Sequence, residues 1–204
     1  MLTGFTAGLL LITVSELGDK TFFIAMILAS RYSREIVMIG VVAALALMTV
    51  LSVLIGQFAT FLPERYITYL EISLFIGFGL KQLYDASQMS SINDGDEEKE
   101  AAQEVQKRTK QLSDKNPQFS LISTAFLMTF LAEWGDRTQI ATITLSASNP
   151  PIGVTLGAVL GHTICAAIAV IGGKMLAKHI SERVLVAVGG GLFLIFAAVA
   201  WLQG

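Results

Sequence analysis

Six long apolar stretches constrain this chain more than any other feature. A bilayer core about 30 Å thick is crossed by roughly 20 apolar residues in a helix. Backbone groups in a bilayer have no water to bond, so such stretches should be helices rather than open strands. The sequence therefore predicts an all-α integral membrane protein with six transmembrane helices. The six stretches are Leu2–Ser30, Ile36–Leu62, Tyr66–Tyr84, Phe119–Ala147, Ile152–Gly173 and Val184–Gly204.

The composition agrees with this class of protein and excludes several others. Charged residues make up 15% of the chain and the mean hydropathy is +0.65, whereas a soluble domain carries about 25% charged residues. A soluble enzyme is therefore excluded, and we expect no enzymatic activity. The single cysteine, Cys165, excludes a disulfide scaffold and a cysteine-based metal site. The net charge of −2 and the absence of a large basic cluster exclude nucleic acid as a partner. Lipid is the expected surrounding, and no oligomeric state is implied.

The charges that are present concentrate in one segment. Twelve of the 30 charged residues lie between Ser87 and Gln118, a segment without aromatic residues. We expect residues 87–118 to be a hydrophilic linker between two three-helix halves, residues 1–86 and 119–204. Its acidic residues either sense metal or only keep the linker soluble, and they include Asp94, Asp96, Glu97 and Glu98.

Lysine and arginine in the loops predict the orientation, because cytoplasmic loops carry an excess of them. Ten lie on the side of the linker and only Arg65 lies on the opposite side. The linker should therefore be cytoplasmic, and both termini should face away from the cytoplasm. The ten are Arg31, Arg34, Lys99, Lys107, Arg108, Lys110, Lys115, Lys174, Lys178 and Arg183.

The two halves resemble each other in sequence. A shift of 117 residues places Glu16 on Glu133 and Gly40 on Gly157, and a shift of 118 places Phe75 on Phe193. Because each half has an odd number of spans, the second copy enters the membrane from the opposite side. We therefore expect a 3+3 inverted-topology repeat, an architecture of many secondary transporters whose site lies near the midplane between the repeats.

Each half carries a charged motif at the middle of its first span. A charge at that depth costs about 2.5–3.5 kcal/mol, so a chain retains it only if the group is paired, hydrated or bound to an ion. On a helix the acidic and basic positions of one motif share a face. If the repeats pack about a two-fold axis, four carboxylates and two cations converge with a charge of −2, which a divalent ion would cancel. The motifs are Glu16-Leu17-Gly18-Asp19-Lys20-Thr21 and Glu133-Trp134-Gly135-Asp136-Arg137-Thr138.

The donor atoms narrow the choice of ion. Carboxylates, the hydroxyls of Thr21 and Thr138 and the amide of Gln139 are hard oxygen donors that suit Ca²⁺, Mn²⁺ or Mg²⁺. Backbone carbonyls could join them if the helices loosen at Gly18 and Gly135. Mg²⁺ gives up its waters reluctantly, so Ca²⁺ or Mn²⁺ fits an all-protein site better. The same carboxylates can carry protons, because metal binding needs them deprotonated. No resident cofactor is needed for an exchange of a divalent ion against protons.

The paired motif in a six-span chain with a central hydrophilic loop resembles uncharacterised protein family sixteen, also called the Gdt family. The resemblance covers essentially the whole chain and implies export of Mn²⁺, and/or Ca²⁺, from the cytoplasm in exchange for protons. It implies a bacterial inner membrane or a cyanobacterial thylakoid or plasma membrane as the location. The resemblance also implies roles for individual residues: four acidic residues as metal ligands, and basic, hydroxyl and amide residues that support them. The ligands are Glu16, Asp19, Glu133 and Asp136; the supporting residues are Lys20, Thr21, Arg137, Thr138 and Gln139.

Other readings stay open at this point. The same residues could line a passive channel for divalent cations, which would conduct without regard to a pH gradient. An exporter of a small organic cation would need a larger or aromatic-lined cavity, and an assembly factor would not need the carboxylates. His162, in the middle of the fifth span, could relay protons or be a hydrogen-bonded structural residue.

Overall fold

The computed structural model describes residues 2–89, 96–110, 116–176 and 182–203. These residues are almost entirely helical and contain no strand. Lys115, Lys178 and Asp94 lie outside them, as do two parts of the predicted linker. The helices are α1 (Leu2–Glu16), α2 (Lys20–Arg31), α3 (Arg34–Ala59), α4 (Glu64–Gln88), α5 (Asp96–Thr109), α6 (Pro117–Ala132), α7 (Arg137–Ser148), α8 (Pro151–Leu176) and α9 (Glu182–Gln203).

The first and fourth predicted spans are not continuous helices. Leu2–Ser30 consists of α1 and α2, and Phe119–Ala147 consists of α6 and α7. Each pair is interrupted at a motif glycine with a positive φ, 81° at Gly18 and 83° at Gly135. The expectation that each motif occupies one face of an unbroken helix was therefore wrong. The reason is that a left-handed glycine ends one helix and redirects the chain before the next helix begins.

Three described helices are long and apolar enough to cross a membrane. They are residues Arg34–Ala59, Pro151–Gly172 and Arg183–Leu202, in α3, α8 and α9. Helices α1 and α6 are apolar but shorter, and α4 has the length but carries several charged residues. The described chain is thus an all-helical protein with three candidate membrane spans.

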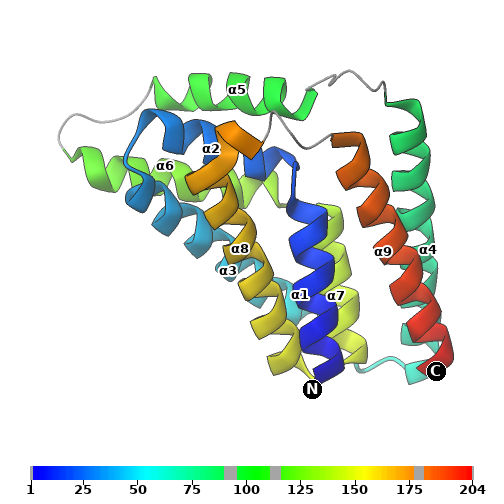
Figure 1. Ribbon diagram of the computed structural model, residues 1–204. Coiled ribbons are helices and arrows are strands. Elements are labelled where there is room, and N and C mark those ends of the chain that lie inside the picture. Colours follow the sequence, from blue (N-terminus) through cyan, green and yellow to red (C-terminus); the bar gives the residue numbers. More distant parts are fainter. Residues whose placement is uncertain (1, 90–95, 111–115, 177–181, 204) are drawn as a thin grey trace.

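The helices converge from a wide end, crossed by α5, to an end where both chain termini lie (Figure 1). Helix α1 packs along α8, α4 packs along α9, and α3 crosses α6, α7 and α8. Glycines permit the closest of these approaches. A Cβ atom on Gly157 in α8 would collide with the backbone carbonyl of Phe5 in α1, and one on Gly161 would lie 3.0 Å from the carbonyl of Leu9. These two glycines, four residues apart on α8, therefore serve close helix packing.

Helix α5 is the described part of the linker, and it is docked rather than free. Its apolar residues Ala101 and Val105 are fully buried in a cluster with side chains of α2, α3, α6 and α8. Its polar residues, such as Lys107 and Arg108, are exposed. The amphipathic pattern of a charged segment thus places a helix across the end of the molecule opposite the termini (Figure 1).

Candidate metal centre

The two helix breaks have the same local geometry. After each left-handed glycine, the aspartate is the N-cap of the second helix, with φ and ψ of −76° and 167° at Asp19 and −70° and 163° at Asp136. In each motif the threonine hydroxyl then reaches back to the glutamate. Thr21 Oγ1 donates to Glu16 Oε2 at 3.1 Å, and Thr138 Oγ1 donates to Glu133 Oε2 at 3.3 Å. Each motif therefore folds into a compact loop that turns its carboxylates inward.

Three of the four predicted ligands come together across the two halves. Glu16, Asp19 and Glu133 each offer a carboxylate oxygen within 4.8 Å of the others, and we call them the carboxylate cluster. Glu16 and Glu133 are each only 2% exposed. Burying carboxylates at this spacing is unfavourable unless protons or a cation compensate their charge. The cluster therefore has the geometry of a cation or proton site.

Each glutamate of the carboxylate cluster keeps one oxygen free. The Oε2 atoms accept from the threonines, whereas within the described residues Glu16 Oε1 and Glu133 Oε1 are buried without a hydrogen-bond partner. Buried polar atoms are nearly always satisfied. Two orphaned anionic oxygens, one from each half, thus point to a ligand or a proton that completes the site.

The basic residues of the two motifs take different partners. Arg137 Nη2 lies 2.8 Å from Asp19 Oδ1, which joins the halves, and it also donates to the carbonyl of Ser15 at 3.4 Å. Lys20 instead pairs with Glu100 of α5 at 3.1 Å. The sequence treats the two positions as equivalent, but in the structure only Arg137 is paired with the carboxylate cluster. With all three carboxylates of the cluster ionised and Arg137 protonated, the four side chains together carry a formal charge of −2.

Asp136 and Gln139 lie beside the carboxylate cluster with partners of their own. Asp136 Oδ2 accepts from the backbone N–H of Thr138 at 3.1 Å, as the cap of α7, and it shares the Thr138 hydroxyl, also at 3.1 Å, with Glu133 Oε2. Gln139 Oε1 accepts from the N–H of Gly135 at 2.7 Å, and its amide nitrogen lies 2.9 Å from the sulfur of Met48. Gln139 therefore fixes the loop, and Asp136 is not among the three grouped carboxylates.

His162 of α8 faces the same cluster. Its Nδ1 lies 3.8 Å from Glu16 Oε1, and neither atom has a hydrogen-bond partner among the described residues. The side chain is 5% exposed. The structure thus places His162 next to the free oxygen of Glu16, beyond direct hydrogen-bonding distance.

A cavity of about 100 Å³ reaches the site from the side of α5. Its polar lining includes Asp19 and Arg137 of the motifs, Gln82 and Asp85 of α4 and Glu97 of α5, and apolar residues, mainly of α1 and α9, complete the wall. Partial burial and the neighbouring Glu100 raise the pKa of the Glu97 carboxyl, whereas Arg137 and Lys20 act in the opposite direction. We call this space the linker-side cavity, and it extends from Asp19 toward Glu97 of α5, at the end of the molecule that α5 crosses.

Toward the termini, the site is closed by apolar side chains. Phe75 of α4 and Phe193 of α9 are fully buried, with ring centroids 5.7 Å apart. They belong to a cluster that includes residues of four further helices, α1, α3, α7 and α8, and we call it the apolar barrier. Its members are Ala7, Leu11, Val53, Phe75, Ala141, Leu145, Val154, Phe193 and Ala197. Since Leu11 and Ala141 lie on the termini side of the motifs along α1 and α7, this apolar cluster lies between the carboxylate cluster and that end, next to the buried hydroxyls of Ser52, Thr142 and Ser146.

Two buried polar residues of α4 were not found by sequence reasoning. Glu71 is 5% exposed and Gln82 is 3% exposed. Neither has a polar counterpart at the corresponding position of α9, so the repeat gave no signal for them. The available signal for Glu71 was its charge within an apolar stretch, which by itself marks a functional candidate in a membrane protein.

Buried carboxylates at paired breaks in apolar helices define a multi-pass membrane protein that handles cations. Comparison with known proteins gives the family. The profile of the family described as "Divalent cation/proton antiporter GDT1" matches residues 4–90 and 121–204. The chain therefore belongs to the GDT1 family of divalent cation/proton antiporters, which are transporters and not enzymes. This confirms the resemblance found in the motifs.

Relatives from cyanobacteria and plants support the same assignment. The chain is 57% identical to the GDT1-like protein sll0615 of Synechocystis over 201 residues, which cover 98% of each chain. It is 41% identical to GDT1-like protein 5 of Arabidopsis thaliana, covering 96% of this chain and 94% of that protein. It is also 41% identical to the chloroplastic PAM71-homolog of Arabidopsis thaliana, but spans only 59% of that longer protein. No solved structure matches the chain.

Proposed function

We propose that this protein exports Mn²⁺, and/or Ca²⁺, from the cytoplasm in exchange for protons. Glu16, Asp19 and Glu133 bind the metal, and Asp136 joins them as a fourth ligand during transport. The observation that carries the proposal is the approach of three carboxylate oxygens to within 4.8 Å of one another, with Glu16 Oε1 and Glu133 Oε1 unpartnered. The family supports a divalent ion and protons as the two substrates.

The donor set supports the choice of metal. Carboxylates and hydroxyls suit hard cations, and a partly protein-enclosed site suits Ca²⁺ or Mn²⁺ better than the strongly hydrated Mg²⁺. The carboxylate cluster with Arg137 carries a formal charge of −2, and the sum is the same when Asp136 and Lys20 are both added, so either set matches one divalent ion. A monovalent or organic cation would leave charge uncompensated in a buried site.

Proton coupling follows from the use of the same oxygens. A metal binds carboxylates only when they are deprotonated, so metal and protons exclude each other. Within a buried cluster, protonation is the alternative way to neutralise Glu16 and Glu133 when the metal has left. This mutual exclusion supports an exchanger, whereas a passive channel built from the same residues would conduct without regard to an imposed pH gradient.

We further propose that the chain is a six-span, 3+3 inverted repeat, with α1–α4 and α6–α9 as its halves. Equivalent close contacts support a two-fold relation. A Cβ atom on Gly40 would lie 2.8 Å from the carbonyl of Ile122, and one on Gly157 would meet the carbonyl of Phe5. The shift of 117 residues places Gly40 on Gly157 and Phe5 on Ile122, so the two contacts are equivalent in the two halves. Each half then crosses the membrane with one broken and two continuous helices.

Alternating access would use the two sides of the site in turn. The linker-side cavity reaches Asp19, whereas the apolar barrier closes the termini side. With the linker in the cytoplasm, as the loop charges indicate, this arrangement is the cytoplasm-facing state of the exchanger. Metal would enter past α5, the two halves would rock, and separation of Phe75 from Phe193 would open the opposite side for release. A bacterial inner membrane or a cyanobacterial thylakoid or plasma membrane is the proposed location.

The test is metal flux into proteoliposomes driven by an imposed pH gradient, with Mn²⁺ and Ca²⁺ followed separately. Flux should follow the gradient in the wild type and disappear in Glu16→Gln and in Glu133→Gln. Glu35→Gln is the matched control, because Glu35 is an exposed glutamate at the start of α3. Flux that ignores the gradient would favour a channel, and normal transport by both motif variants would refute the site.

A further inference from the structure

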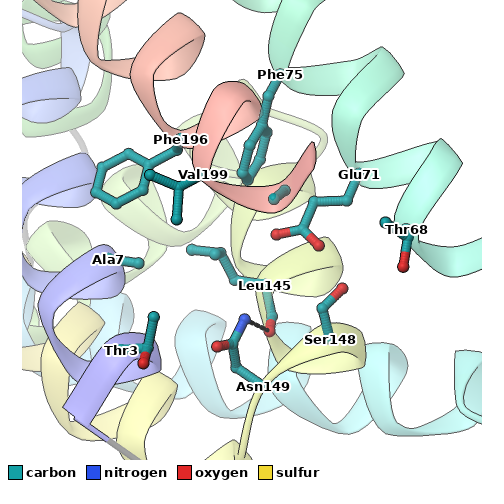
Figure 2. Close-up of a pocket in the computed structure, with 11 residues that line it drawn as sticks. Thr3, Ala7, Thr68, Glu71, Phe75, Leu145, Ser148, Asn149, Phe196 and Val199 are labelled. Atoms are coloured by element: carbon teal, nitrogen blue, oxygen red, sulfur yellow. Dashed lines mark hydrogen bonds between the residues drawn. The ribbon is translucent and has the colours of Figure 1, made fainter. Parts of the chain in front are cut away.

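A second polar cavity lies on the termini side of the apolar barrier. It has a volume of about 190 Å³ and is lined by residues of α1, α4, α7 and α9 (Figure 2). Its lining contains no residue of either charged motif. It is therefore separate from the carboxylate cluster, and we call it the termini-side cavity.

One carboxylate projects into this cavity. Figure 2 shows the Glu71 side chain reaching from α4 toward the Ser148 hydroxyl, with Phe75 above it on the same helix. Glu71 is 5% exposed, and among the described residues no basic side chain pairs with it. Ser148 is its polar neighbour. A carboxylate that is 95% buried without a cation is unfavourable, so its retention in an apolar helix needs a ligand or a proton.

The termini-side cavity adjoins a larger hollow at the end of the molecule where the chain termini lie. Thr68 and Ser148 line both the cavity and this hollow, which has a volume of about 810 Å³ and is also lined by Arg65 and Trp201. Glu71 is therefore nearest to the solvent at that end of the molecule. Thr3 and Asn149 add further oxygen donors to the wall of the cavity (Figure 2).

The position of Glu71 relative to the barrier gives the site a place in the transport path. Glu71 and Phe75 are four residues apart, so they lie on one face of α4. Phe75 lines the termini-side cavity and also belongs to the apolar barrier. Opening of the barrier at Phe75 would thus connect the carboxylate cluster with Glu71.

We propose that Glu71, with the Ser148 hydroxyl and cavity water, forms a second binding site for a divalent cation on the release side of the exchanger. The proposal rests on the proposed function and deepens it. A carboxylate with neutral oxygen donors suits a hard, partly hydrated cation. The cavity exceeds many times the ~10–15 Å³ that one water needs, so the ion can keep part of its hydration shell. Glu71 holds the ion after the carboxylate cluster has released it and before it reaches bulk solvent.

The site predicts a one-sided effect on transport. Right-side-out and everted membrane vesicles from cells producing the protein present opposite faces to added Mn²⁺. Glu71→Gln should raise the KM for Mn²⁺ supplied from the termini side about tenfold, equivalent to ~1.4 kcal/mol, and leave the KM on the linker side unchanged. Glu71→Asp should restore most of the affinity. An unchanged KM on the termini side, or an equal loss on both sides, would overturn the proposal.

A binding measurement separates this site from the proposed function. Mn²⁺ binding to the purified full-length protein is followed by loss of the free-ion electron paramagnetic resonance signal. Glu133→Gln should remove binding at the carboxylate cluster and retain one weaker site, which the additional change Glu71→Gln should remove. If the double variant Glu133→Gln with Glu71→Gln still binds Mn²⁺ at the weaker site, the proposal of a second site at Glu71 is overturned. Absence of pH-coupled Mn²⁺ transport in the wild type, with the weak site intact, would refute the proposed function and leave the second site standing.

Discussion

Removing the charge of Arg137 should tighten metal binding. Its guanidinium lies 2.8 Å from Asp19, and the two side chains are 27% and 15% exposed. An incoming divalent cation must either displace Arg137 from Asp19 or bind beside it. In both cases the positive charge of Arg137 opposes the metal, so Arg137→Gln should lower the Kd.

The contact sets the size of this effect. Two unit charges 4 Å apart interact by about 4 kcal/mol at an effective dielectric constant of 20. Exposed pairs contribute about 0.2–1 kcal/mol, and breaking a buried pair costs about 3–5 kcal/mol. The partial exposure of this pair places its contribution between these limits, at roughly 1–2 kcal/mol. Since ~1.4 kcal/mol is a tenfold change in Kd, we expect Mn²⁺ to bind about 5- to 30-fold more tightly.

The assay is titration calorimetry of purified protein with Mn²⁺ in mildly alkaline buffer, where competition by protons is weak. Lys20→Gln is the matched control, because Lys20 occupies the same motif position but pairs with Glu100. Its Kd should stay within about twofold of the wild type, as expected for an exposed ion pair. Equal effects of the two variants, or weaker binding in Arg137→Gln, would refute the reasoning.

Three further predictions concern the backbone, the barrier and α5. Gly135→Ala should destabilise the protein by about 1–2 kcal/mol in thermal denaturation, through its φ of 83° alone, since nothing lies within 4 Å of the added Cβ. Gly135→Asn should destabilise the protein less in the same assay, because asparagine adopts this backbone conformation more readily. Phe193→Ala should produce Mn²⁺ leakage from loaded proteoliposomes without a pH gradient, whereas a tight barrier in a verified folded variant would contradict the role of the apolar barrier. Burial raises the pKa of Glu97 above 4.5, so α5 docking should strengthen as the pH falls through the raised value and weaken as it rises. Hydrogen exchange of α5 measures this, and Glu97→Gln should remove that part of the pH dependence.

The sequence predicted the helical class and the motifs because both depend on local patterns. Apolar length indicates helices in a bilayer, and the duplicated glutamates mark the middle of two spans. The breaks were foreseen only as possible loosening at Gly18 and Gly135. A glycine is compatible with both a helix and a left-handed turn, so the pattern alone did not decide between them.

The different roles of Lys20 and Arg137 could not be predicted from the repeat. Lys20 meets Glu100, which lies 80 positions away in the linker, and the linker has no second copy. An element outside the repeat therefore breaks the equivalence of the two motifs. Glu71 was missed for a related reason, because its position in α9 is occupied by an apolar residue or glycine.

The central claim is that one set of carboxylates binds metal and protons in turn. In the most direct measurement, Mn²⁺ is added in steps to purified protein in a weak buffer at about pH 6, and proton release is recorded with an indicator dye. The account predicts that the wild type releases protons in proportion to the metal bound, and that Glu16→Gln and Glu133→Gln lose most of both signals. Tight Mn²⁺ binding without proton release, or undiminished release in both variants, would contradict it.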